Sequence, residues 1–248
     1  NSRPVTPQSN SIKLDSNEEI SILNFKKINE VPWADFDVDI VIECSGVLSN
    51  FKLASEFQNK LPNILFSYAH PDMETIIMGA NNGNFDKKKK LFSASICDSV
   101  SLAPLYNLLN NKYSIISGHL ITLHPWLSYQ NLLDGPAKSW SLPGDILSHY
   151  SLGRSSVGSV IPKNTSAVLA TSYIFPEIIQ KIDSFSYRVP IGTVTSSTLI
   201  VNVKNKVTAT EVNKLLTHFS NENSLIMKVT DEPLVSIDYS SEPYSLII

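Results

Sequence analysis

The sequence predicts a chain of the α/β and α+β classes, in which part of an open parallel sheet precedes a domain with a large, mostly antiparallel or mixed sheet. The first observation is the β-branched run Asp39–Cys44. It is followed by the small-residue turn Ser45-Gly46 and by a helical pattern at Asn50–Lys60, as when a parallel strand enters a βαβ unit. The second is a series of long strands after residue 113 with helices inserted, which favours helices on one face of that sheet. The third is a globular balance of 42% hydrophobic and 17% charged residues among 248.

The elements of the first part are short. Ser11–Leu14 and Ile20–Phe25 read as a hairpin around the turn Asp15-Ser16-Asn17. Asn50 could cap the helix that follows the first parallel strand. Further strands are predicted at Asn63–Phe66, Thr75–Met78 and Lys90–Ser93.

The second part begins with a helix at Ser99–Asn110, which Asp98 or Ser99 could cap. Pro104 lies inside it, so the helix either starts late or bends there. Strands are predicted at Ser114–His124, Phe185–Val189, Val194–Val203 and Leu234–Asp238, with helices at Thr165–Phe175 and Ala209–Ser220, the latter capped by Thr208 or Thr210. Lys138–Arg154 reads as a long irregular segment.

Composition excludes several classes of protein. A net charge of −3 argues against nucleic-acid binding, and the lysine run at 87–90 reads as a solvated loop. No stretch approaches the roughly 20 apolar residues of a membrane span, and the N-terminus has no secretory pattern. The two cysteines, Cys44 and Cys97, form neither a disulfide framework nor a set with zinc-ligand spacing. We therefore expect no metal and a reducing, cytoplasmic setting.

Two residues have the position that thiol chemistry requires. Cys97 lies just before a helix N-terminus, where the helix dipole favours a thiolate. His124 ends a long strand and could serve as its base. A buried, unreactive cysteine and a structural histidine are the alternatives, and position alone does not decide between these readings.

A resemblance to a known family adds to these observations. The segment Ser93–Pro104, with Cys97 inside it, resembles the active-site segment of glyceraldehyde-3-phosphate dehydrogenases, usually written S-N-A-S-C-T-T-N-C-L-A-P. Other matches follow in the family's order and spacing. They are Ile40–Val47 (the strand before E-x-T-G), Met78–Asp86 (M-G-V-N-x-x-x-Y-D), Leu123–Pro136 (the histidine segment), Ile161–Thr165 (I-I-P-x-x-T-G), Tyr187–Pro190 (F-R-V-P) and Asp231–Asp238 (E-D-P-x-V-S-x-D).

The resemblance implies a chemistry and a site. Cys97 would form a hemithioacetal with an aldehyde, and His124 would take its hydroxyl proton as hydride leaves for NAD or NADP. Backbone N–H of Cys97 and His124 would stabilise the oxyanion. The resulting thioester would pass to phosphate or water. Arg188, Thr165 and, in a flexible loop, Arg154 would hold phosphate groups, while Ser45, Gly46 and Ser67 would line the dinucleotide site.

By the same resemblance, residues 1–96 would be the remainder of the NAD(P)-binding domain and residues 97–248 the catalytic domain. The substrate would be a phosphorylated sugar aldehyde, and the full-length protein a homotetramer. No G-x-G-x-x-G follows a strand in this sequence, and the family's closing W-Y-D-N-E segment is absent. We therefore expect a piece of a longer protein, one that binds NAD poorly by itself.

Several departures from the family fall in the phosphate-binding motifs. Asp98 stands where the family has a hydroxyl donor, and it is expected to cap the helix and to repel a phosphate dianion. The other departures are Ile96, Val100, Leu127 and Ser166. An erythrose-4-phosphate dehydrogenase type, a phosphate-independent aldehyde oxidation and a catalytically weak binding homologue therefore stay open as alternatives.

Overall fold

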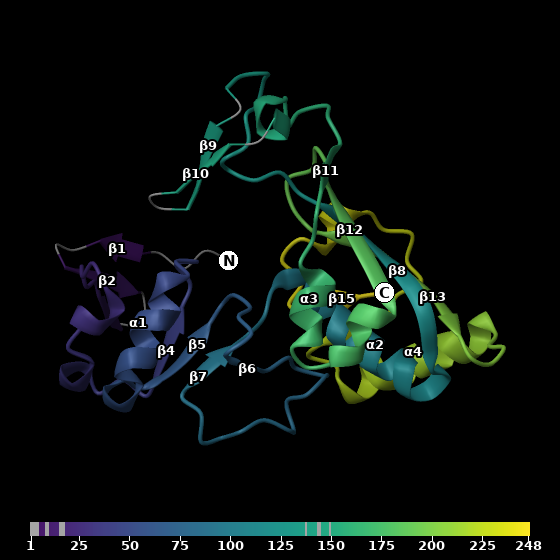
Figure 1. Cartoon of the computed structure of the whole chain (residues 1–248), viewed down its shortest axis with the longest axis horizontal. Helices are drawn as coiled ribbons and strands as arrows, with labels where there is room; N and C mark the ends of the chain where they lie inside the picture. The colour runs from purple at the N-terminus through teal and green to yellow at the C-terminus, as the bar shows by residue number, and fades with distance from the viewer. Residues whose placement is uncertain (1–4, 8–9, 15–17, 137, 143–144, 149) are drawn as a thin grey trace. The chain divides into compact units, whose positions relative to one another are not determined.

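The computed structural model describes residues 5–7, 10–14, 18–136, 138–142, 145–148 and 150–248 (Figure 1). The chain packs as two compact units, which are residues 1–39 with 48–62 and residues 40–47 with 63–248. The functional boundary that we place between residues 96 and 97 falls inside the second unit, and it stays a prediction.

The first unit contains a three-stranded antiparallel sheet and several short helices. Its strands are β1 (Val5–Pro7), β2 (Ser11–Leu14) and β3 (Glu19–Ser21), and its helices are η1 (Ile28–Glu30), η2 (Trp33–Phe36), α1 (Ser49–Phe57) and η3 (Gln58–Lys60). Pairing of Ser11 with Ser21 confirms the predicted hairpin, whose turn residues 15–17 lie outside the described residues. The second strand ends at Ser21 rather than Phe25, and Asn50 lies inside α1 rather than at its N-cap, which is Leu48.

The second unit opens with a parallel sheet. Its strands are β4 (Ile40–Glu43), β5 (Asn63–Phe66), β6 (Glu74–Thr75) and β7 (Leu91–Ser93), in the order β4-β5-β7-β6. Every neighbouring pair is parallel, which confirms the prediction from the β-branched runs. Parallel strands end at the same edge, so the residues after Glu43 and Phe66 share one edge of this sheet.

A mixed sheet forms the larger part of the unit. It contains β8 (Ile115–His124), β11 (Ile161–Lys163), β12 (Ile182–Arg188) and β13 (Ser196–Val203), in the order β11-β12-β8-β13. The two central strands, β12 and β8, run parallel, and both outer pairs are antiparallel. This arrangement confirms the predicted fold class (Figure 1).

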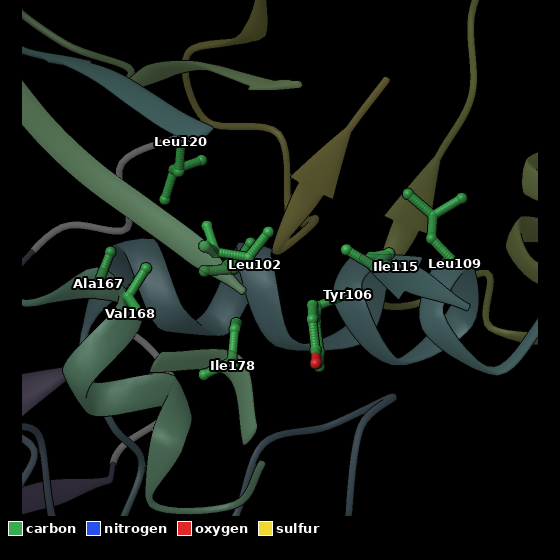
Figure 2. Close-up of a cluster of buried hydrophobic side chains, with 9 residues drawn as sticks. Leu102, Tyr106, Leu109, Ile115, Leu120, Ala167, Val168 and Ile178 are labelled. Atoms are coloured by element: carbon green, nitrogen blue, oxygen red, sulfur yellow. The ribbon is translucent and has the colours of Figure 1, made fainter. Parts of the chain in front are cut away.

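Helices cover one face of the mixed sheet and enclose its core. They are α2 (Cys97–Tyr113), α3 (Ala167–Ser172), η5 (Pro176–Gln180) and α4 (Ala209–Glu222). Figure 2 shows the buried cluster, to which α2 contributes Leu102, Tyr106 and Leu109, the strands Ile115, Leu120 and Ile182, and the other helices Ala167, Val168 and Ile178. Burying an aliphatic side chain of this size contributes about 1.5–3 kcal/mol. A Cβ atom at Gly118 would lie 2.4 Å from the carbonyl oxygen of Ile200, so the strand pairing requires glycine there.

The ends of the helices correct one prediction and confirm another. Ile96 is the N-cap of α2, in an extended conformation and without a side-chain cap. Capping by Asp98 or Ser99 was therefore wrong, because the helix begins at Cys97 and leaves both residues in its first turn. Pro104 lies within the helix, which does not start late. Thr208 caps α4 in a capping box with Glu211, as one of the two predicted caps.

The remaining elements include two further differences from the sequence reading. They are β9 (Lys138–Leu142) paired with β10 (Asp145–Ser148), η4 (Tyr150–Gly153), β14 (Met227–Lys228) paired with β15 (Leu246–Ile247), and η6 (Ser236–Tyr239). The segment predicted to be irregular thus contains a strand pair. The predicted strand Leu234–Asp238 is instead a turn of 3-10 helix, because the Asp238 carboxylate accepts a hydrogen bond from the backbone N–H of Val235 at 2.8 Å.

No helix within the described ranges has the length and apolarity needed to cross a bilayer.

Candidate active site

The helix-covered face of the mixed sheet changes from apolar to polar along β8 and β12. On β8 the buried side chains are Leu120, Thr122 and His124 in turn, and on β12 the face passes from Ile182 to Arg188. Arg188 lies opposite His124 in the parallel register. Side chains alternate between the two faces of a strand, so the apolar core and this polar end belong to the same continuous surface.

The turn between β7 and α2 places Cys97 beside this polar end. Ser95 has a φ of 64°, a conformation that L-residues adopt with a cost of roughly 1–2 kcal/mol. Its backbone N–H donates to Oγ of Ser93 at 2.9 Å, and Oγ of Ser93 donates to the carbonyl oxygen of Tyr68 at 2.8 Å. These hydrogen bonds hold the strained turn from which Cys97 begins α2.

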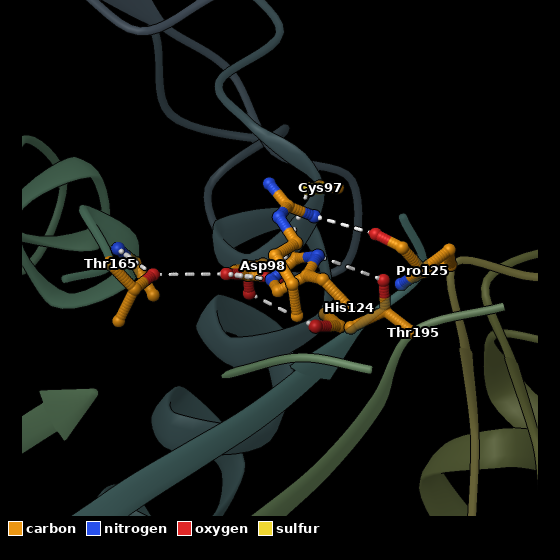
Figure 3. A network of polar contacts seen from close by, with 9 residues as sticks. Cys97, Asp98, His124, Pro125, Thr165 and Thr195 are labelled. Atoms are coloured by element: carbon orange, nitrogen blue, oxygen red, sulfur yellow. Dashed lines mark hydrogen bonds and ion pairs between the residues drawn. The ribbon is translucent and has the colours of Figure 1, made fainter. Parts of the chain in front are cut away.

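Asp98 joins the groups of the site. Its side chain is buried, with a residue exposure of 6%. Oδ2 lies 3.0 Å from Nε2 of His124 and accepts a hydrogen bond from Oγ1 of Thr165, also at 3.0 Å. Oδ1 lies 3.8 Å from Sγ of Cys97. Figure 3 shows Asp98 between Thr165 and His124.

The thiol, the carboxylate and the imidazole form a compact set. Sγ of Cys97, a carboxylate oxygen of Asp98 and a ring nitrogen of His124 all lie within 4.8 Å of one another. The hydrogen bond of Nε2 goes to Asp98. The direct Cys97–His124 hydrogen bond expected from the paired motifs is thus replaced by a shared contact with the Asp98 carboxylate.

Two further residues orient the histidine and the arginine. Oγ1 of Thr195 lies 3.2 Å from Nδ1 of His124, on the ring nitrogen opposite Asp98 (Figure 3). Nη1 of Arg188 donates to the carbonyl oxygen of Pro125 at 3.2 Å. Within the part of the chain that the structure describes, its Nε is buried without a hydrogen-bond partner, as are the hydroxyls of the facing pair Thr122 and Ser186. Buried polar atoms of this kind are rare in native proteins, so they are available to a bound polar group.

The electrostatics of the site favour an ionised Asp98 and a protonated Cys97. Burial alone would raise the pKa of the Asp98 carboxyl, but hydrogen bonds and charge from His124, with the Thr165 hydroxyl, hold that pKa below its ordinary value. Burial raises the pKa of the Cys97 thiol, and the adjacent Asp98 charge adds to the effect. The thiolate expected from the helix N-terminus is therefore opposed by this carboxylate, which the position argument did not include.

The same cluster includes a lysine that the sequence reading passed over. Burial lowers the pKa of the Lys163 ammonium, and so does the positive charge of Arg188, while Asp98 and Cys97 act in the opposite direction. Lys163 lies on the edge strand β11, opposite Ser186 of β12. Lys163 is an exposed residue, and its positive charge acts on the site together with that of Arg188.

Comparison with known proteins gives the family. Residues 96–248 match the family model described as glyceraldehyde 3-phosphate dehydrogenase, C-terminal domain. The chain belongs to the glyceraldehyde 3-phosphate dehydrogenase family. It is 29% identical to glyceraldehyde-3-phosphate dehydrogenase of Clostridium acetobutylicum over 89% of this chain and 64% of that protein. It is also 29% identical to glyceraldehyde-3-phosphate dehydrogenase 2 of Bacillus subtilis, over 93% of this chain and 66% of that protein.

The chain therefore spans just under two thirds of the length of these relatives. The family match begins at residue 96, one residue before Cys97 and the expected start of the catalytic domain.

The site residues expected in a glyceraldehyde 3-phosphate dehydrogenase fall into two groups here. Cys97, Asp98, His124 and Thr165 form one contact network, with Arg188 opposite His124 in the sheet. Arg154 is exposed and forms an ion pair with Asp134 at 3.3 Å, so a role for it in the site stays a prediction.

The expected dinucleotide residues lie at the carboxyl edge of the parallel sheet. Ser45 and Gly46 follow β4, and Ser67 follows β5. Gly46 has a φ of 71°, and the backbone N–H of Ser67 donates to the carbonyl oxygen of Glu43 at 2.9 Å. Both serines are exposed at this edge, where open parallel sheets bind their ligands. The Ser45 hydroxyl donates to the Glu43 carboxylate, and a role for these residues in binding a dinucleotide stays a prediction.

Proposed function

We propose that this chain carries the thiol site of an oxidoreductase that oxidises an aldehyde with NAD or NADP as the acceptor. The observation that carries the proposal is the cluster of Cys97, Asp98 and His124 within 4.8 Å at the start of α2. Membership of the glyceraldehyde 3-phosphate dehydrogenase family supports it, as do the names of the similar proteins. The proposed substrate is a phosphorylated sugar aldehyde similar to glyceraldehyde 3-phosphate, as used in glycolysis.

In the proposed reaction Cys97 is the nucleophile. Its sulfur forms a bond to the aldehyde carbon, the carbonyl π bond breaks, and the thiol proton passes to the new hydroxyl through the Asp98–His124 pair. Backbone N–H of Cys97, at the N-terminus of α2, stabilises the charge that develops on oxygen. His124 then takes the hydroxyl proton.

The bound nicotinamide would supply the hydride acceptor. Loss of hydride from the hemithioacetal carbon would leave an acyl thioester on Cys97. Ser45, Gly46 and Ser67 would contact the dinucleotide at the carboxyl edge of the parallel sheet. Arg188 would hold a phosphate group of the substrate, because its buried Nε has no hydrogen-bond partner among the described residues. An additional contact from Arg154 would require its loop to leave the Asp134 pair.

A second candidate, release of the acid with water, is favoured by the contacts of Asp98. Thr165, one of the expected phosphate ligands, donates its hydroxyl to the Asp98 carboxylate. An ionised carboxylate accepts hydrogen bonds and repels a phosphate dianion. An erythrose-4-phosphate dehydrogenase type or another phosphate-independent oxidation would tolerate this arrangement better than acyl transfer to phosphate. A catalytically weak binding homologue is the third candidate, favoured by the raised pKa of the Cys97 thiol.

The proposal includes association of the full-length protein into a homotetramer. The face of the mixed sheet away from the helices exposes large apolar side chains, including Ile116 at 59%, Ile200 at 55% and Phe185 at 40%. Exposed apolar side chains on one face of a sheet favour association. A reducing, cytoplasmic setting completes the proposal, since both Cys44 and Cys97 are free thiols in the structure.

The test is an assay of the full-length protein that follows reduction of NAD and of NADP. Glyceraldehyde 3-phosphate, erythrose 4-phosphate and unphosphorylated glyceraldehyde are offered with and without inorganic phosphate. Turnover that is lost in Cys97→Ser and reduced at least a hundredfold in His124→Asn supports the proposal. Absence of turnover with all three aldehydes, in a sample that binds the dinucleotide, supports the binding homologue instead.

A further inference from the structure

Cys97, Asp98 and His124 offer three different metal-binding atoms at the spacing that one ion needs. The sulfur and the nearest carboxylate oxygen are 3.8 Å apart, the other carboxylate oxygen and Nε2 are 3.0 Å apart, and the three ligand atoms all lie within 4.8 Å. In a tetrahedral zinc site, bond lengths of about 2.0–2.3 Å place such ligand atoms roughly 3.4–3.6 Å apart. Binding of one ion would require the exposed Cys97 side chain to rotate toward the other two ligands and the Oδ2–Nε2 distance to widen by roughly a few tenths of an ångström.

Two of the three ligands are already oriented by outer hydrogen bonds. Nδ1 of His124 contacts Oγ1 of Thr195, and Oδ2 of Asp98 accepts from Oγ1 of Thr165. Bound metals depend on this support, because a histidine or carboxylate ligand is held in place by the partner on its far side. A threonine hydroxyl can donate or accept, so Thr195 fits either tautomer of the ring.

We propose that this cluster binds a divalent zinc ion through Sγ of Cys97, the carboxylate of Asp98 and Nε2 of His124, with the fourth position open to water. Three protein ligands and one open position are the pattern of catalytic zinc sites, in which water occupies the fourth position. A sulfur, a nitrogen and an oxygen ligand select zinc over magnesium or calcium, which prefer oxygen alone.

The charges are balanced when the ion binds. The Cys97 thiol loses its proton to solvent as the S–Zn bond forms. In a neutral His124, the Nε2 proton moves to Nδ1, where it is donated to Thr195. Thiolate and carboxylate then contribute two negative charges against the two positive charges of the ion. The positive charges of Arg188 and Lys163 act on these ligands and oppose cation binding, so the three-ligand set with Asp98 is needed to hold the ion.

Asp98 is the ligand that distinguishes this site from the family motif. Its position in the family motif is a threonine, whose neutral hydroxyl is a poor zinc ligand. Since the ion would occupy the nucleophile and the base, bound zinc would block the proposed aldehyde chemistry, and this regulatory consequence rests on the proposed function. Binding itself does not, and it can be measured on the 248-residue chain without substrate or cofactor.

The experiment is calorimetric titration of the chain with zinc chloride, with cobalt chloride as the spectroscopic probe. We expect one zinc ion per chain and a sulfur-to-cobalt charge-transfer band. Asp98→Asn and Asp98→Thr should each weaken zinc binding at least tenfold, and Cys97→Ser should remove the band. The matched control is His218→Ala, which removes the exposed His218–Glu222 pair at 3.5 Å and should leave binding unchanged.

A second measurement needs no variant. Saturating zinc should slow alkylation of Cys97 by iodoacetamide at least tenfold while alkylation of the exposed Cys44 continues, and a chelator should restore the rate. The inference is overturned if zinc leaves the Cys97 rate unchanged, if both Asp98 variants bind zinc as tightly as the native chain, or if His218→Ala removes the binding. Aldehyde turnover is not part of either readout. A failure to bind zinc would therefore not contradict the proposed function, and an absence of aldehyde turnover would not contradict zinc binding.

Discussion

Nε2 of His124 lies 3.0 Å from the carboxylate of Asp98, a residue 26 positions earlier in the chain, and both side chains are buried. The pairing brings the first turn of α2 to the end of β8. It also places a negative charge beside the Cys97 sulfur. Both the pKa of the Cys97 thiol and the contact of His124 therefore depend on Asp98.

The first prediction concerns stability and pH. The pKa of folded Asp98 lies below its ordinary value, so the ionised carboxylate stabilises the fold above the unfolded pKa of about 3.9, and this contribution is lost as pH falls through the folded pKa. Asp98→Asn should lower the free energy of unfolding by about 1–3 kcal/mol at pH 7, and by less near pH 3, which lies below the unfolded pKa.

Thermal or urea unfolding at both pH values measures the difference. Asp134→Asn is the matched control, since it removes the exposed Asp134–Arg154 pair and should change stability by less than about 1 kcal/mol. A deficit in Asp98→Asn that is as large at pH 3 as at pH 7 would show that packing, and not the charge, is responsible.

The second prediction concerns the reactivity of Cys97. Burial and the charge of Asp98 both raise the pKa of its thiol, so little thiolate is present at neutral pH. Asp98→Asn removes one of these causes and should increase the alkylation rate of Cys97 at pH 7.5 about threefold to tenfold, because only the thiolate reacts. The rates should converge at high pH.

Peptide mapping by mass spectrometry separates Cys97 from Cys44, which serves as the internal control because both thiols are free and exposed. Equal acceleration at both cysteines would indicate general loosening of the fold. A slower reaction at Cys97 in the variant would contradict the proposed electrostatic effect.

The third prediction assigns Thr195 as a positioning residue for His124. Thr195→Val removes the hydroxyl 3.2 Å from Nδ1, a hydrogen bond of about 1 kcal/mol. In the full-length enzyme kcat should fall about fivefold, since 1.36 kcal/mol corresponds to tenfold, with KM nearly unchanged and the acid limb of the pH profile displaced.

Thr195→Ser should restore the native values, because it keeps the hydroxyl. Thr198→Val, three residues along β13 and also exposed, should have no effect. A kcat for Thr195→Val within experimental error of the native value would remove Thr195 from the site.

Local chemistry made much of the fold predictable from sequence. The β-branched run at Ile40–Glu43 and the apolar run at Asn63–Phe66 formed parallel strands with nearly the predicted ends. Thr208 followed three residues later by Glu211 formed the capping box that such spacing favours. Ser236–Tyr239 departed from its expected strand because one side-chain hydrogen bond, from Val235 N–H to Asp238, outweighed β propensity.

The contacts of the site depend on register, which a single sequence does not contain. Whether Asp98 caps its own helix or reaches His124 depends on where α2 begins, and the structure starts it at Cys97. Thr195 and Lys163 gave no signal as isolated residues, since only the pairing of β13 and β11 with the central strands brings them near His124 and Arg188. Zinc-ligand spacing in sequence was absent for the same reason.

The last prediction concerns the acyl acceptor. The Asp98 carboxylate takes the hydroxyl of Thr165 and adds a buried negative charge next to Cys97. Repulsion of an incoming phosphate dianion could amount to a few kcal/mol, on the order of the Coulomb energy at an effective dielectric constant of about 20.

The full-length enzyme should therefore depend weakly on inorganic phosphate and release a substantial share of its product as the acid. Asp98→Thr should free Thr165, remove the charge and strengthen the phosphate dependence, whereas Glu222→Gln, which removes the exposed His218–Glu222 pair, should not. Product analysis and phosphate titration at fixed aldehyde concentration measure both effects. If the native enzyme saturates with phosphate at ordinary millimolar levels and Asp98→Thr does no better, then the carboxylate does not control the acceptor.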